Sequence, residues 1–364
     1  MSPLPINESL LLPLVVSPKQ PAHPPLKQNN PADRRQRFFV RCIIPHPKTI
    51  KVVYKPKKLC YNALEQIVDI ATIQNDLLFR RFVMAKIKVT CDSTCDLTKE
   101  IYESLGVSVM PLGVYLGDEL RRDGVTATAL EIFDFVDKTG TLPKTSACSI
   151  GEYTDFFKQF TDDGYEVIHI NIGSDLSASH QNARLAAEDL EGVYVIDSKN
   201  LSSGSGHLVM EAYEMAQAGM EAADIAAKLN EMAPKLDVSF VVQTLDYLHK
   251  GGRCSGVATL GANLFKLRPC IDVKQGKLGV GKKYRGSMIK TLRDYITDRL
   301  SGRDDLNLKR IFITHSHAPA EVVEELKALI AELQPFEEII ETVAGCTITS
   351  HCGPDCLGVL FFTK

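Results

Sequence analysis

From residue 85 onward, short apolar runs alternate with amphipathic stretches, and polar loops separate them. Near-continuous apolar runs, such as Glu166–Ile172 and Val193–Ile196, are typical of strands buried on both faces of a parallel sheet. Ser149 and Glu152 have the spacing of a capping box, which predicts a helix running to about Phe160. This order of strand, polar loop and helix predicts βαβ units. Further strands are predicted at Lys86–Cys91 and Val107–Met110, and further helices at Leu97–Leu105 (with Asp96 as N-cap), Ala127–Lys138 and Ser179–Leu190.

The pattern changes after Val238–Gln243. Short strands near Ile271 and Leu278 flank Lys274–Lys277, a sequence typical of a hairpin turn. Beyond it, helices are predicted near 286–300 and 319–333, and strands at Arg310–Thr314, Glu338–Val343 and Gly358–Phe362. The sequence therefore predicts an α/β protein with two α/β domains: residues 85–240 with a parallel sheet and residues 241–364 with a mixed sheet.

The first 84 residues differ sharply from the rest. They hold 13 Lys and Arg against 5 Asp and Glu, and 11 of the 18 prolines but none of the 24 glycines. Such a segment has little with which to build a core, and we expect a disordered extension. One interpretation is that translation starts at Met84 and the upstream residues come from a misassigned start. The alternative is a targeting or interaction extension, because the segment contains arginine and few acidic residues.

Composition excludes several classes of protein. No apolar stretch approaches the roughly 20 residues that span a bilayer, so no membrane span is expected. The formal net charge of −3 gives no general electrostatic reason to bind nucleic acid. Ten cysteines in 364 residues are too sparse for a disulfide scaffold. They are typical of reduced thiols, and we expect a cytoplasmic protein.

Two motifs resemble cofactor sites but fit other structures better. Gly276–Lys283 has the spacing of a phosphate-binding loop, yet the last residue is Lys283 where Ser or Thr should bind magnesium, and the segment falls in the predicted hairpin. Cysteines spaced four apart (91 and 95, 352 and 356), with His351 and the pair His315 and His317, lack the framework of a zinc site, so we expect no metal. We also expect no cofactor.

Hydroxyl groups, glycines and aspartates cluster in loops that nearly all follow a predicted strand. In open parallel sheets, ligands bind beyond the carboxyl ends of the strands, and hydroxyls near helix N-termini can form an anion site. Each loop taken alone is equally well explained by helix capping, but several loops converging on one sheet edge favour a binding site. The residues are Asp92, Ser93 and Thr94; Thr145 and Ser146; Gly173, Ser174 and Ser177; Asp197 and Ser198; and Ser202 to Gly204.

The second half of the chain adds two candidate segments. Leu245–Arg253 contains two glycines before Arg253, which allow close backbone approach to a ligand. Gly345–Pro354 places His351 before Gly353 on what we predict to be a tight turn after a strand. An arginine, a histidine and several hydroxyls at loop positions are suited to a carboxylate or a phosphate.

Taken together, these segments resemble the DegV family, the fatty-acid-binding subunits of bacterial fatty acid kinases. The resemblance covers essentially all of the chain after Met84. It is carried by Asp92–Leu97, Thr145–Ser146, Ile172–Ser177, Asp197–Ser198, Leu245–Arg253 and His351–Pro354. It implies a two-domain α/β fold that buries a long-chain fatty acid between its domains and is not an enzyme alone. A separate kinase subunit phosphorylates the bound acid to an acyl phosphate, which feeds phospholipid synthesis.

Matched residue by residue, the resemblance implies that Thr145, Ser177 and His351 hold the carboxylate and that Arg253 works with the kinase. The chain departs from the family in following Thr145–Ser146 with Ala147–Cys148, where Gln-Pro is usual. Ser177 and Pro354 are also followed by unusual residues, which leaves chain-length preference open. Two rival functions stay open: an acyl or phosphoryl hydrolase or transferase using Ser177 and His351, with Asp197 or Asp92 as orienting acid, and a lipid sensor with another partner.

Overall fold

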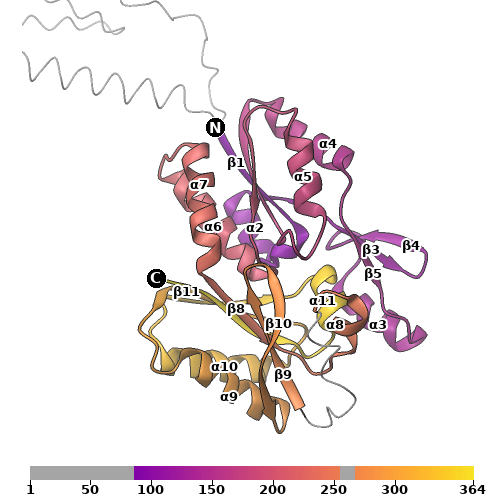
Figure 1. Cartoon of the computed structure of the whole chain (residues 1–364), viewed down its shortest axis with the longest axis vertical. Helices are drawn as coiled ribbons and strands as arrows, with labels where there is room; N and C mark the ends of the chain where they lie inside the picture. The colour runs from indigo at the N-terminus through magenta and orange to yellow at the C-terminus, as the bar shows by residue number, and fades with distance from the viewer. Residues whose placement is uncertain (1–85, 255–266) are drawn as a thin grey trace, which may run out of the picture. The chain divides into compact units, whose positions relative to one another are not determined.

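The computed structural model describes residues 86–254 and 267–364 of the chain (Figure 1). The expected extension, residues 1–84, lies outside the described residues. The fold is α/β with a parallel sheet in the first half and a mixed sheet in the second, as predicted. The boundary at residue 240 between two domains stays a prediction.

The parallel sheet has the strand order β2-β1-β6-β7. Its strands are β1 (Lys86–Asp92), β2 (Ser108–Met110), β6 (Tyr165–Asn171) and β7 (Val193–Asp197). Alternate residues of β6 face opposite sides: Val167 packs with α4 (Ile150–Thr161) and α5 (Ser179–Ala187), whereas Ile168 and Ile170 pack with α6 (Ser203–Gln217) and α7 (Ala222–Met232). Figure 1 shows these two helix pairs on opposite sides of the sheet. The continuous apolar runs thus arise because both faces are covered, as predicted.

The predicted capping box is confirmed at the start of α4, where Ser149 and Glu152 bond reciprocally. The prediction that Asp96 caps the next helix is wrong. Thr98 caps α2 (Lys99–Leu105), and Asp96, after the short helix η1 (Ser93–Cys95), has a φ of 49°. The Asp96 carboxylate instead accepts hydrogen bonds from Ser202 Oγ (2.5 Å) and from the Gly345 amide (2.8 Å).

A small antiparallel sheet, not predicted from the sequence, projects beside the parallel one. Its order is β4-β3-β5, with β3 (Gly113–Leu116), β4 (Glu119–Arg122) and β5 (Lys144–Ser146), and α3 (Ala129–Thr139) connects β4 to β5. Thr145 pairs with Val114 across β3 and β5. Thr145 and Ser146 therefore lie within a strand and not in a loop after one.

The mixed sheet has the order β10-β9-β8-β13-β11-β12, in which only β11 and β12 run parallel. The hairpin is confirmed: Gln275 and Gly276 both have positive φ, as a two-residue turn requires, and the phosphate-loop-like segment lies in β10. The strands are β8 (Leu236–Val241), β9 (Leu267–Lys274), β10 (Lys277–Arg285), β11 (Leu306–His315), β12 (Glu338–Val343) and β13 (Leu357–Thr363).

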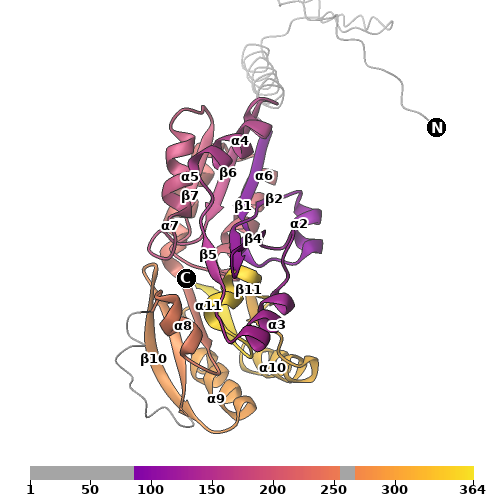
Figure 2. The same ribbon diagram turned by 90° about the vertical axis from the view of Figure 1, so that its right-hand side faces the viewer.

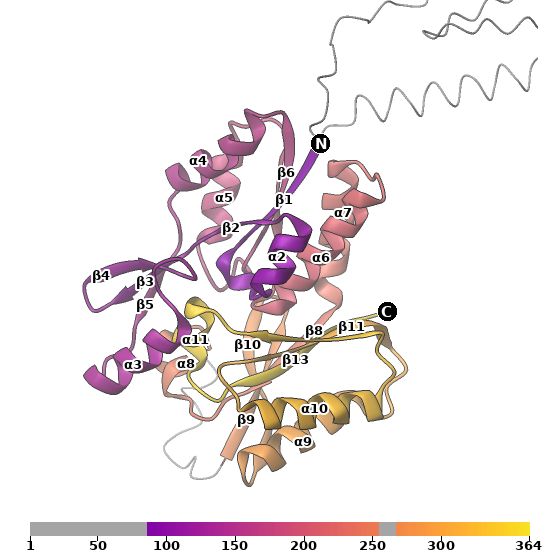
Figure 3. The same cartoon turned by 180° about the vertical axis from the view of Figure 1, so that it is seen from behind.

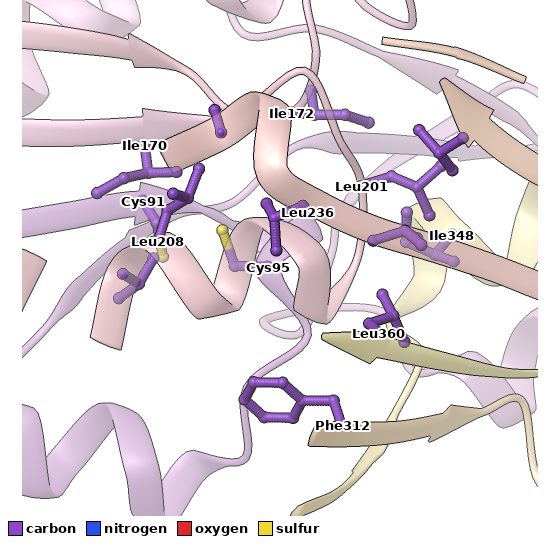
Figure 4. Close-up of a cluster of buried hydrophobic side chains, with 14 of the residues drawn as sticks. Cys91, Cys95, Ile170, Ile172, Leu201, Leu208, Leu236, Phe312, Ile348 and Leu360 are labelled. Carbon is purple, nitrogen blue, oxygen red and sulfur yellow. The ribbon is translucent and has the colours of Figure 1, made fainter. Parts of the chain in front are cut away.

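Helices cover both faces of the mixed sheet. On one face α9 (Met288–Leu300) and α10 (Ala320–Leu333) lie side by side and pack on Ile311, Ile313 and Phe361 (Figure 3). On the other face α6 packs against β11 and β13, so that one apolar cluster reaches from the parallel sheet to the mixed sheet. Figure 4 shows this cluster, with Cys91 and Ile170 on one side and Phe312 and Leu360 on the other.

Two short helices complete the second half. Leu245–Arg253, which we assigned to a loop, contains α8 (Asp246–Gly251), and a short turn η2 (Ala233–Lys235) precedes β8. His351 was predicted on a tight turn, but it lies in the last turn of α11 (Cys346–Cys352). This helix contacts α8, α3 and the strands β3 and β5, as can be followed in Figure 2.

Candidate functional site

A hollow of about 570 Å³, partly open to solvent, lies where α11 meets β5 and the loop after β6. Among its wall residues are five of the polar positions singled out from the sequence: Thr145, Ser146, Ser177, Arg253 and His351. Most of the remaining wall is aliphatic, from Leu112, Ile172, Leu176, Leu201, Leu248, Leu278 and Ile348. The arrangement combines a small polar group with an apolar interior, as small-molecule sites generally do.

Thr145 and His351 are in direct contact although they are 206 positions apart in the chain. Thr145 Oγ1 and His351 Nε2 are 2.8 Å apart. Burial lowers the pKa of His351 to about 4, and the positive charge of Arg253 acts in the same direction. The imidazole is therefore neutral at pH 7, with one ring nitrogen as donor and the other as acceptor.

The other face of the imidazole is closely packed. His351 Nδ1 is buried without a hydrogen-bond partner. Gly251, the last residue of α8, leaves the space that the ring fills, because a Cβ there would lie 2.4 Å from Nδ1. Gly353 has a φ of 76°, and a Cβ on it would lie 2.7 Å from Cδ2 of Tyr247. The two glycines thus let α8 and α11 approach closely.

Ser177 lies in the loop between β6 and α5, and its side chain is half-buried. Its Oγ is 3.0 Å from Ser179 Oγ and accepts a hydrogen bond from the Ser179 amide at 3.2 Å. No bond between Ser177 and His351 occurs in the described residues. The two side chains share the hollow, so each could contact a ligand placed between them.

Arg253 is exposed and bridges two walls of the hollow. Its Nη1 donates to the Gly251 carbonyl (2.7 Å), and its Nε donates to the Leu176 carbonyl (3.5 Å). The guanidinium therefore connects the end of α8 to the residue that precedes Ser177. It is positioned to meet both a ligand in the hollow and a molecule outside it.

The other polar residues and glycines singled out from the sequence do not line this hollow. Asp92 is fully buried and accepts bonds from Thr94, Asn171 and Ile172, although burial still raises the pKa of its carboxyl. The others are engaged in similar internal bonds: Ser93 donates to Asp123, Ser174 donates to Asp197, Ser198 bonds to Asn200, and the Gly353 carbonyl accepts from Ser316. These residues shape the loops and do not face a ligand.

Sequence reasoning missed the residues that fix α11 in place. Asp123, at the end of β4, accepts hydrogen bonds from the amides of Cys346 (2.8 Å) and Thr347 (3.0 Å). Together with the bond from Gly345 to Asp96, these contacts occupy the first free amides of the helix, as a capping residue normally does. Asp123 is more than 220 positions from its partners, so no local pattern could have indicated it.

A second hollow of about 360 Å³ adjoins the first. The two share Leu201, Ile348 and Cys352 as walls. The second hollow reaches β8, β11 and β13 and includes Val238, Phe240 and Leu360. The second hollow therefore lies next to the first, on the side of the two sheets.

Metal ligands, reactive thiols or a membrane-spanning helix would indicate other kinds of site. Within 86–254 and 267–364, no group of three or more His, Cys, Asp or Glu side chains could hold a metal ion. Seven cysteines of this part of the chain are buried and free: Cys91, Cys95, Cys148, Cys270, Cys346, Cys352 and Cys356. In the same residues, no helix is long and apolar enough to cross a membrane.

The described part of the chain is similar to known proteins along nearly its whole length. The profile of the DegV family, described as uncharacterised proteins, matches residues 86–364. A DegV domain-containing protein of Clostridium acetobutylicum is 30% identical over 285 residues, which cover 77% of this chain and 100% of the relative.

Two solved structures are similar. A DegV family protein of Thermus thermophilus, described with fatty acid binding, has a TM-score of 0.68 and 29% identity, covering 77% of this chain and 100% of that one. A Thermotoga maritima protein described as having a fatty acid binding function has a TM-score of 0.67 and 27% identity, with the same coverage. The chain belongs to the DegV family.

Proposed function

We propose that this protein binds a long-chain fatty acid, with its carboxylate held by Thr145, Ser177 and His351. The observation that carries the proposal is the meeting of Thr145 and His351 at 2.8 Å in the wall of an otherwise aliphatic hollow. The fatty acid binding described for the Thermus and Thermotoga relatives supports it. The acyl chain runs past Leu201 and Ile348 into the second hollow.

The energetics suit a lipid better than a small polar acid. Burying an acyl chain of roughly sixteen carbons contributes on the order of 12 kcal/mol before the costs of association. The neutral His351 and two hydroxyls supply hydrogen bonds without a full positive charge. The carboxylate thus keeps much of its negative charge and can act as a nucleophile.

The second part of the proposal concerns the fate of the bound acid. A separate kinase subunit phosphorylates the carboxylate to an acyl phosphate, and Arg253, exposed at the hollow, contacts that kinase or the transferred group. Phosphoryl transfer requires positioning and charge neutralisation around a nucleotide. The nearest match to a nucleotide loop in this chain is the β9–β10 hairpin, so the nucleotide is bound by the partner.

We expect this function in the cytoplasm, where free buried thiols such as those of Cys91 and Cys95 would stay reduced. The products would enter phospholipid synthesis. The statement about phospholipid synthesis rests on the expected kinase partner.

Native mass spectrometry of the purified full chain tests the proposal. We expect a bound species whose mass matches a long-chain fatty acid and which is released on denaturation. Delipidated protein should then bind hexadecanoate with a stoichiometry of one. A protein that neither retains nor takes up fatty acids would contradict the proposal.

The rival hydrolase receives no support from the site. A serine nucleophile needs a base that is oriented by a third group. In the described residues Ser177 bonds to Ser179, and His351 Nδ1 has no partner. Asp92 and Asp197, the two candidates for an orienting acid, bond elsewhere. Turnover of acyl esters by the delipidated protein would restore this rival.

A further inference from the structure

One hydroxyl in the wall of the hollow has no role so far. Thr347 lies in the first turn of α11 and is only 5% exposed, and its Oγ1 is buried without a hydrogen-bond partner. A buried hydroxyl without a partner is uncommon in a folded protein, because it loses its bonds to water without replacement. Thr347 also lines the hollow, so a ligand could provide the missing partner.

The two other hydroxyl residues of α11 behave differently. Thr349 donates to the Ala344 carbonyl (3.2 Å), and Ser350 donates to the Cys346 carbonyl (2.7 Å). Such bonds to the preceding turn are the usual way for a helix to satisfy these side chains. Thr347 makes no such bond, so its hydroxyl is left without a partner beside the hollow.

The position of Thr347 relative to His351 is well defined. The two are four residues apart on α11, so they share one face with Cβ atoms about 5–6 Å apart. The Thr347 amide is bound to Asp123 at 3.0 Å, which fixes this end of the helix. The hollow therefore has a second polar point, one helical turn away from the Thr145–His351 pair and beside the aliphatic wall of Leu112 and Ile348.

We propose that the preferred ligand is an oxygenated fatty acid, carrying a hydroxyl group close to its carboxyl end that hydrogen-bonds Thr347 Oγ1. The inference rests on the proposed function, because it takes the carboxylate to be held by Thr145, Ser177 and His351. One helical turn from that point, the ligand is only a few carbons along its chain. A 3-hydroxy acid places an oxygen in this region, and a threonine hydroxyl can both donate to it and accept from it.

Two other partners for Thr347 are outcomes of the test. It could bond the carboxylate itself, although Thr145, Ser177 and His351 already converge there. It could bond a water molecule, which would make it indifferent to the ligand. Each of these partners predicts a different change in fatty acid affinity when the Thr347 hydroxyl is removed.

The experiment measures the affinity of the delipidated full chain for hexadecanoate and for 3-hydroxyhexadecanoate by calorimetry. The wild type should bind the hydroxy acid about tenfold more tightly, since a buried partner without a hydrogen bond gains one. Thr347→Val keeps the shape and removes the hydroxyl, and it should abolish this preference, so that the two acids bind with similar affinity. Thr347→Ser should restore the preference.

Thr291→Val is the matched control. Thr291 Oγ1 is likewise buried without a partner, but Thr291 lies in α9 and does not line the hollow. This variant should keep the full preference for the hydroxy acid. A second readout is the lipid that co-purifies with each protein, which should include species with one extra oxygen in the wild type but not in Thr347→Val.

The results distinguish failure of the inference about Thr347 from failure of fatty acid binding itself. If Thr347→Val weakens both acids equally, the hydroxyl holds the carboxylate and the inference is wrong. If the wild type shows no preference, or the variant keeps it, the inference is wrong while fatty acid binding stands. If the wild type binds neither acid, both the inference and the proposed function fail.

Discussion

The imidazole of His351 lies against the α-carbon of Gly251, so closely that a single added methyl group would be 2.4 Å from Nδ1. Gly251 ends α8 and has no positive φ, so its requirement for glycine comes from this contact and not from its backbone conformation. The glycine therefore positions the imidazole of His351, the residue that we propose holds the fatty acid carboxylate.

We predict that Gly251→Ala displaces the imidazole and breaks its bond to Thr145. Fatty acid affinity should fall roughly 10- to 100-fold, the equivalent of one hydrogen bond to a charged group. Isothermal calorimetry on the delipidated protein measures this effect.

Gly252→Ala is the control for Gly251→Ala. Gly252 has a φ of 70° and no atom within 4 Å of an added Cβ. That variant should lose about 1 kcal/mol of stability because of backbone strain, but it should bind fatty acid normally. Equal loss of binding in both variants would argue against the contact with His351.

The hydroxyl anchors give a second prediction. Thr145→Ala or Ser177→Ala should each remove about 1.5–3 kcal/mol, a loss of affinity like that in Gly251→Ala, while burial of the tail, which contributes more, keeps the acid bound. Acyl phosphate formation with a fatty acid kinase should fall far more, because the carboxylate is then misplaced. Ser174→Ala, in the same loop but bonded to Asp197, is the control and should leave both activities intact. Unchanged phosphorylation in Ser177→Ala would show that this loop does not hold the carboxylate.

A third prediction separates binding from transfer at Arg253. Arg253→Ala should leave fatty acid affinity nearly unchanged and impair phosphorylation by the kinase. It should also raise the pKa of His351, because the Arg253 charge helps to lower it. Titration of the His351 ring by NMR measures that shift independently of any partner. Lys250 is an exposed cation on α8 that does not line the hollow. Lys250→Ala should therefore change neither the phosphorylation rate nor the pKa of His351.

The fourth prediction concerns stability and pH. Burial lowers the pKa values of His169 and His207 to about 3. In the unfolded chain a histidine titrates near 6.5, so below that pH the unfolded state binds protons that the folded state does not. Stability should therefore fall as pH decreases from 7 to 5, by roughly 2 kcal/mol for each of the two histidines.

Denaturant unfolding at both pH values checks this dependence. His207→Gln should show a smaller difference between pH 7 and pH 5 than the wild type, whatever its absolute stability. His249→Gln, which alters an exposed histidine, should keep the wild-type difference. A stability that does not change between pH 7 and 5 would mean that the buried rings are already protonated or are exposed to water.

The sequence predicts an element of this structure well when neighbouring residues determine it, and poorly when contacts between distant segments determine it. The strand β6 was evident because both faces of the sheet are covered, with Val167 packed on one side and Ile168 and Ile170 on the other, which leaves a continuous apolar run. The small sheet was not evident because β3, β4 and β5 are three or four residues long and mostly half-exposed. These strands form because they pair with one another, and such pairing leaves no periodic pattern of apolar residues in the sequence.

The candidate site was also predictable in its residue types but not in the contacts between distant segments. The residue types suited to a carboxylate were recognisable, and the family resemblance indicated Thr145, Ser177 and His351. Their arrangement depends on contacts between distant segments, such as the bonds from α11 to Asp96 and Asp123. Asp96 resembled a helix cap because Thr98, the actual cap, is only two residues away. Thr347 carried no signal at all, because its significance is the absence of a partner in the folded chain.

Helix α6 has a consequence for how the protein unfolds. Its Leu208 packs in the cluster that also holds Ile170 of the parallel sheet and Phe312 of the mixed sheet. If either sheet came apart, α6 would lose half of its cover and expose apolar surface that stabilises the other sheet. We therefore expect the two sheets to unfold as a single cooperative unit, so that the described part of the chain melts in one transition. A ligand that lies between the sheets adds its binding energy to that one transition and raises the melting temperature of the whole.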